Sequence, residues 1–152
     1  MNDQQPIPDR RLPRSERLRS LGAVRRLFTE GEGGFVYPFR YMYHVTRPDA
    51  AGGPSLEGAA EACETKRTQP SGSVEVLFSV PKRFHKRANR RNLLKRRTRE
   101  AYRLGREALR TTVREKGVDI DVALVYSVKE CQSYRSIDHA VQRILERIRT
   151  SL

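Results

Sequence analysis

The sequence has no tryptophan and only two cysteines among its 152 residues. Cys63 and Cys131 are widely separated, which fits neither a disulfide framework nor the paired spacing of a zinc site. No apolar run approaches the ~20 residues of a membrane-spanning helix. Residues 1–14 also lack the apolar stretch of a signal peptide. We therefore expect a cytoplasmic protein with reduced cysteines that does not contact a membrane.

Acidic residues are scarce, because 18 Asp and Glu stand against 31 Lys and Arg and give a net charge of +13. Residues 82–116 contain 15 of the basic and 3 of the acidic residues, so this segment carries +12 of that charge. Positive charge concentrated in one segment is typical of proteins that bind the phosphates of nucleic acids. The hydrophobic fraction of 37% is enough for one modest core.

Polar residues and three prolines predict a flexible tail over residues 1–13. The hydrophobic pattern predicts a single α+β domain over 14–152, which the concentrated positive charge makes a candidate RNA-binding domain. Gly, Pro and Ala dominate residues 47–73, which we interpret as a disordered insertion between two strands. Ser20 and Gly31 are placed to begin and end the first helix, and Gly117 to end the second. The expected elements are helices at 21–30, 89–116 and 134–148, and strands at 35–45, 74–80 and 118–128.

The strand predicted at 35–45 alternates with a period of two. Its aromatic face, from Phe35 to Val45, is the natural core face, which leaves Arg40, Met42 and His44 on the other side. Pro38 cannot donate to a strand ladder, so it indicates an edge or a bulge near the start of the strand.

The predicted helix 89–116 has one cationic face. On a helical wheel, seven cations fall within a sector of about 140°: Arg91, Lys95, Arg99, Arg103, Arg106, Arg110 and Arg114. The opposite sector holds small and apolar residues that suit packing on a sheet: Leu93, Leu94, Thr98, Ala101, Leu104, Gly105 and Ala108. A solvated helix face normally mixes charges of both signs, so this face is expected to bind an anionic partner. Basic helices that bind membranes carry a larger apolar face.

Two stretches resemble the protein subunit of bacterial ribonuclease P. Residues 79–84 read SVPKRF and residues 91–102 read RNLLKRRTREAY, similar to a family strand that ends in Ser-Val-x-Lys-Lys and a helix that opens with Arg-Asn-Arg. Residues 27–31 resemble the end of the family's first helix, and residues 121–125 its last strand. The resemblance covers residues 12–149 apart from 47–73. This chain departs from the motif at its third position, where Leu93 replaces arginine.

The resemblance implies an αβββαβα sandwich, like domain 2 of ribosomal protein S5. It also implies a left-handed βαβ crossover, where physical rules alone favour a right-handed one. The chain would be the protein subunit of a ribonucleoprotein endonuclease that removes the 5′ leader of precursor tRNA. Its catalytic RNA partner, expected at 1:1, would carry out the hydrolysis with magnesium that the RNA mainly binds. The protein itself would contribute no catalytic residue and no tight metal site.

The resemblance also suggests two binding surfaces. The residues expected to contact the catalytic RNA are Lys82, Arg83, Arg91, Asn92, Lys95, Arg96, Arg99 and Arg103, with Asn92 near RNA-bound magnesium or capping its helix. A cleft between the first helix and the sheet would bind the leader through Phe28, Arg40 and Met42. From the residues alone, Phe28 could equally belong to the core.

Three other functions remain open on sequence grounds. A ribosomal protein or an RNA chaperone would explain the charge but not the order of the motifs. A DNA-binding or nucleoid protein has no helix-turn-helix spacing in its favour. A free-standing nuclease would need carboxylates such as Asp119 and Asp121, which share one strand face and which we interpret as a polar strand start. His85 lies in the basic segment, where it could touch RNA.

Overall fold

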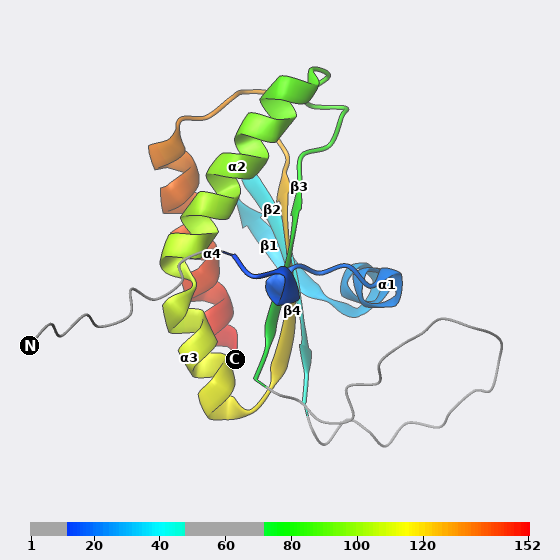
Figure 1. Ribbon diagram of the computed structural model, residues 1–152, viewed down its shortest axis with the longest axis vertical. Helices are drawn as coiled ribbons and strands as arrows, with labels where there is room; N and C mark the ends of the chain where they lie inside the picture. The colour runs from blue at the N-terminus through cyan, green and yellow to red at the C-terminus, as the bar shows by residue number, and fades with distance from the viewer. Residues whose placement is uncertain (1–11, 48–71) are drawn as a thin grey trace, which may run out of the picture.

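The computed structural model describes residues 12–47 and 72–152 (Figure 1). The predicted tail and insertion fall almost wholly outside these ranges. The elements are a short 3-10 helix η1 (Arg14–Glu16), α1 (Leu21–Glu30), β1 (Glu32–Val36), β2 (Phe39–Thr46), β3 (Val74–Ser79), α2 (Ala88–Gly105), α3 (Glu107–Lys116), β4 (Asp119–Tyr126) and α4 (Tyr134–Ser151). The α+β class and the αβββαβα order are confirmed, with the motif helix divided in two.

The four strands form one sheet in the order β1-β2-β4-β3. β2 pairs antiparallel with β1 and β4, whereas β3 and β4 are parallel. Helices α2, α3 and α4 cover one face of the sheet and α1 lies on the other (Figure 1). The crossover from β3 through α2 and α3 to β4 is left-handed: seen from the helices with the strands pointing up, the chain moves to the left.

The main core lies between the sheet and helices α2 to α4. α4 contributes the stripe that its period predicts, because Ile137, Val141, Ile144 and Ile148 are fully buried. A smaller cluster holds α1 against the opposite face through Leu27, Ala123 of β4 and Leu18. Ser20 begins α1 as expected, accepting a hydrogen bond from the Ala23 N–H at 3.4 Å. Gly117 ends α3 in the left-handed region, with φ 60°.

The single strand predicted at 35–45 is wrong, because the chain turns back at Tyr37 and Pro38 to form the β1–β2 hairpin. Across the turn Val36 pairs with Phe39, so both lie on the core face, whereas Phe35 pairs with Arg40 on the other face. Phe35 is consequently 53% exposed. Proline suits this turn because it has no N–H to donate.

The single helix predicted at 89–116 is also wrong, because it breaks between α2 and α3 at Arg106. Arg106 is only 5% exposed, and its Nη1 lies 2.5 Å from Oε2 of Glu16. Glu16 also lies 3.5 Å from Nε of Arg110, so one carboxylate pairs with both arginines. Two leucines assigned to the buried sector, Leu93 and Leu104, are exposed instead.

We expect the Glu16–Arg106 ion pair to be a main stabilising contact between η1 and the α2–α3 junction. Glu16→Ala removes the carboxylate that pairs with the buried Arg106 guanidinium and should lower the free energy of unfolding by about 3–5 kcal/mol. Glu107→Ala removes an exposed partner of Arg110 and should cost less than about 1 kcal/mol. Urea denaturation of both variants measures the difference, and equal effects would contradict the assignment.

Candidate nucleic-acid interface

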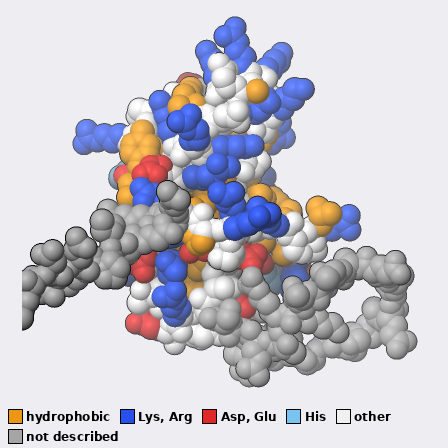
Figure 2. Space-filling model, in the orientation of Figure 1, with side chains coloured by type: hydrophobic (Ala, Val, Ile, Leu, Met, Phe, Trp, Pro, Cys, Tyr) orange, Lys and Arg blue, Asp and Glu red, His pale blue; other side chains and the backbone are white. Residues whose placement is uncertain are grey.

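An exposed cationic surface runs along the β3–α2 loop and the outer side of α2. We call it the basic ridge and define it by its exposed members: Lys82, Arg83, Lys86, Arg87, Arg90, Arg96 and Arg99. Figure 2 shows Lys and Arg side chains gathered over this part of the molecule, with few acidic ones among them. The sequence produces this arrangement because Leu94, Thr98, Ala101 and Tyr102 bury the inner side of α2.

The residues predicted to bind the catalytic RNA fall into two groups. Those with exposed side chains are Lys82, Arg83, Asn92, Arg96 and Arg99, and Lys95 is half-buried beside them. Arg83 also stacks on the Phe84 ring, with its guanidinium carbon 4.7 Å from the ring centre. The structure therefore brings these six side chains to one side of the molecule.

The other group consists of arginines already engaged within the protein. Arg91 Nη1 donates to the carbonyl oxygens of His85 at 2.9 Å and Lys86 at 2.7 Å. Arg103 forms a two-point ion pair with Glu100, and this hydrogen bonding lowers the pKa of the Glu100 carboxyl. The prediction that seven cations form one exposed face is therefore wrong for Arg106, which is buried. The charge of Arg103 is partly neutralised by Glu100.

A buried histidine, His85, anchors the loop that carries Lys82 and Arg83. His85 is buried, with Nε2 2.9 Å from the Val128 carbonyl oxygen and its ring against Tyr126. The suggestion that His85 touches RNA is therefore wrong. Together with Arg91, it holds the loop against the end of the sheet and so fixes the first cations of the basic ridge.

Asn92 does not cap its helix. It is the fifth residue of α2, whose N-cap position is Arg87, and no side chain caps that end. Asn89 is the asparagine in the first turn, and its Oδ1 accepts the Arg90 N–H at 2.8 Å. The Asn92 amide thus projects from the exposed side of α2, beside the arginines of the basic ridge.

A second exposed surface lies on the α1 side of the sheet. The strand register places Phe35, Arg40, Val125 and Ser79 in one row across the four strands. The next row, with Met42, Ala123 and Leu77, packs beneath α1. Arg40 is therefore open to solvent, whereas Met42 is half-buried among the residues that hold the helix.

Phe28 and Glu30 lie on different sides of α1. Glu30 Oε2 lies 3.6 Å from His44 Nε2, and Asp121 pairs in register with His44. At 100° per residue, Phe28 projects from α1 on the side away from Glu30. We define this α1-side surface by Phe28, Phe35 and Arg40; it is aromatic and basic. Sequence reasoning missed Phe35 because the alternation assigned it to the core face.

The carboxylates considered for a free-standing nuclease form no metal centre. Asp119 Oδ1 accepts hydrogen bonds from the Ser73 N–H at 2.9 Å and the Ser73 hydroxyl at 3.0 Å, which ties β4 to the start of β3. Among residues 12–47 and 72–152, no group of three or more His, Cys, Asp or Glu side chains could hold a metal ion. The same ranges contain no helix long and apolar enough to cross a membrane.

Fold and surface together define a small α+β domain of the RNA-binding kind. A model of the Ribonuclease P family matches residues 12–149. The ribonuclease P protein component of Porphyromonas gingivalis (strain ATCC 33277) is 30% identical over 137 residues, which cover 90% of this chain and 85% of that protein. The Chlorobaculum tepidum protein component is 39% identical over 101 residues, or 64% of this chain and 53% of that protein.

Solved structures share the fold. The Staphylococcus aureus ribonuclease P protein aligns with a TM-score of 0.53 at 14% identity, covering 88% of this chain and 94% of that one. A mutant of that protein, described as defective in mRNA degradation activity, aligns with a TM-score of 0.57 at 15% identity. The chain belongs to the ribonuclease P protein family, as its motifs indicated, and is thus a protein subunit of the tRNA 5′-processing ribonuclease.

The exposure of Phe28 resolves whether it belongs to the core. It is 46% exposed, whereas its neighbour Leu27 is fully buried. Leu27→Ala should therefore lower the free energy of unfolding by about 2–5 kcal/mol, and Phe28→Ala by less than about 1 kcal/mol. Chemical denaturation of the two variants tests this directly. A large loss of unfolding free energy in Phe28→Ala would show that Phe28 belongs to the core.

Proposed function

We propose that the basic ridge binds the catalytic RNA of ribonuclease P and that the α1-side surface binds the 5′ leader of precursor tRNA. The observation that carries the proposal is the concentration of exposed cations on one loop and one helix face, within a motif of this family. A row of arginines matches a row of phosphates, because each planar guanidinium can pair with two phosphate oxygens. The expected stoichiometry is one protein to one RNA.

The chemistry itself is proposed to lie with the RNA. In the described part of the chain, His85 is committed to a backbone carbonyl and Asp119 to Ser73, so neither is placed to act as a general base. Because the described carboxylates do not fit a metal centre, we propose that magnesium is held mainly by the RNA, with Asn92 close to it. The protein's part is then to neutralise phosphates and to position the substrate.

The leader is proposed to lie on the side of α1 that carries Phe28. A single strand offers unstacked bases to an aromatic ring, whereas the duplex of mature tRNA does not. Arg40 is exposed and can neutralise a leader phosphate nearby.

The decisive experiment is reconstitution at low magnesium. The purified chain should restore 5′ cleavage of precursor tRNA by the catalytic RNA, whereas a ribosomal protein or RNA chaperone should not. Affinity for the RNA should fall roughly 1,000-fold between 50 and 200 mM salt if about six phosphates are neutralised. An affinity that stays constant over this range would refute the electrostatic mechanism.

Variants separate the two surfaces. Arg96→Ala or Arg99→Ala should weaken assembly with the RNA for every substrate and reduce the salt slope by about one. Arg143→Ala, an exposed arginine on α4 outside the basic ridge, is the matched control and should change neither.

Phe28→Ala should leave assembly unchanged but reduce affinity for precursor tRNA by about five- to 100-fold, the loss expected for one base stack. Binding of mature tRNA should not change, and Phe28→Tyr should retain the parent affinity because it keeps the ring. If a folded Phe28→Ala variant kept the parent's preference for precursor over mature tRNA, the leader assignment would be wrong.

A further inference from the structure

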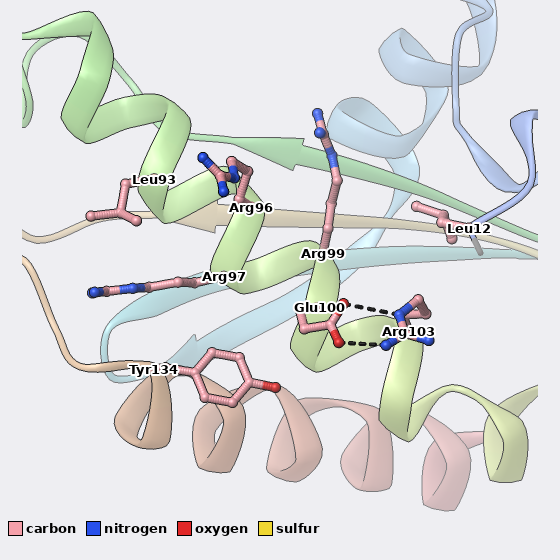
Figure 3. Close-up of a pocket in the computed structure, with 8 residues that line it drawn as sticks. All are labelled: Leu12, Leu93, Arg96, Arg97, Arg99, Glu100, Arg103 and Tyr134. Atoms are coloured by element: carbon pink, nitrogen blue, oxygen red, sulfur yellow. Dashed lines mark hydrogen bonds and ion pairs between the residues drawn. The ribbon is translucent and has the colours of Figure 1, made fainter. Parts of the chain in front are cut away.

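A groove of about 430 Å³ lies between α2 and the start of α4, beside the basic ridge, with which it shares Arg96 and Arg99. Leu93 and Tyr134 form apolar walls at one end and Leu12 lies at the other, with Arg96 and Arg99 along the α2 side (Figure 3). Its volume is within the range of sites that take small organic groups. Sequence reasoning missed this groove because it assigned Leu93 to the buried face of its helix.

Three of the charged residues that line the groove already have partners within the protein. Arg97 Nη1 donates to the Gln132 carbonyl oxygen at 2.8 Å, which ties α2 to the loop before α4. Glu100 and Arg103 hold each other across one turn of α2 (Figure 3). These contacts fix the walls and occupy the carboxylate that lines the groove. None of the three can pair with a further charge without breaking one of these contacts.

Arg96 and Arg99 remain as open cations. Both are exposed, and no carboxylate of residues 12–47 or 72–152 forms a salt bridge with either. Tyr134, the first residue of α4, is 36% exposed and lies across the groove from α2 (Figure 3). An aromatic ring on one side of the groove and two arginines on the other match a ligand with one flat unsaturated group and flanking anions, which is the chemistry of a nucleotide in a single strand.

We propose that this groove binds one unpaired nucleotide of the RNA strand that crosses α2. The base lies against Tyr134 and Leu93, and its flanking phosphates pair with Arg96 and Arg99. Leucine at the third motif position gives the groove an apolar wall where an arginine would place a charge. The proposal rests on the proposed function, because the strand that reaches the basic ridge belongs to the catalytic RNA.

The absence of tryptophan makes a direct test possible. Tyr134→Trp introduces a single indole, whose fluorescence is quenched when a base stacks on it. Leu104→Trp places the same probe at an exposed position of α2 that does not line the groove. A six-nucleotide oligoadenylate should quench the first variant and not the second. An abasic oligomer with the same number of phosphates should quench neither, because it offers charge without a base.

Affinity for the catalytic RNA supplies the second measurement. Tyr134→Ala and Leu93→Ala should each reduce it about five- to 100-fold, as removal of a base contact does, whereas Tyr134→Phe and Leu104→Ala should change it less than about twofold. Thermal melting of each variant without RNA identifies any loss that comes from unfolding. Unchanged affinity in folded Tyr134→Ala and Leu93→Ala variants would overturn the proposal.

Other occupants give different results. Fluorescence of the Tyr134→Trp variant could already be quenched without RNA and recover when residues 1–11 are deleted. That result would show that the chain's own terminus fills the groove, and it would overturn the proposal. Reconstituted cleavage by the parent chain tests the proposed function separately from the groove. Cleavage without quenching refutes the groove alone, whereas failure of cleavage refutes the proposed function whatever the fluorescence shows.

Discussion

The parallel pairing of β3 with β4 determines where the positive charge of this protein lies. Parallel neighbours cannot be joined by a tight turn, so the chain must cross over the sheet between them. The basic segment 82–116 supplies that crossover. Its inner side is buried against the sheet and α4, where a charge would be costly, so nearly all its cations must point outward. Packing alone thus converts a charged segment into the basic ridge.

The same sheet separates the two exposed surfaces. α2 and α4 use one face almost completely, whereas the short α1 covers only the middle row of the other and leaves Phe35 and Arg40 open. An aromatic surface and a cationic surface therefore lie on opposite faces of one sheet. A surface substitution on one face leaves the other face intact, so single variants can distinguish the two surfaces.

Elements with a clean period were predictable from sequence, and those shaped by distant contacts were not. α4 and β4 follow their hydrophobic patterns closely, and Ser20 and Gly117 mark helix ends as expected. The hairpin could not be predicted because the aromatic alternation continues through Tyr37. In β1 the even-numbered Val36 faces the core, whereas in β2 the odd-numbered residues from Phe39 onward do. Arg106, at the break between α2 and α3, pairs with Glu16, 90 positions away, and no local pattern reveals this contact. The groove needed the relative placement of α2 and α4.

The basic ridge has a consequence for stability in the free protein. Arg96 and Arg99 are three positions apart, and Lys95 and Arg99 four, so like charges meet on one side of α2 and disfavour the helix. Little opposes this within the helix itself beyond the Glu100–Arg103 pair. α2 is therefore held mainly by its buried side, through Leu94, Ala101 and Tyr102. A partner that brings phosphates to the ridge removes the repulsion and stabilises the folded chain by mass action, so RNA binding and helix stability are coupled through the same arginines.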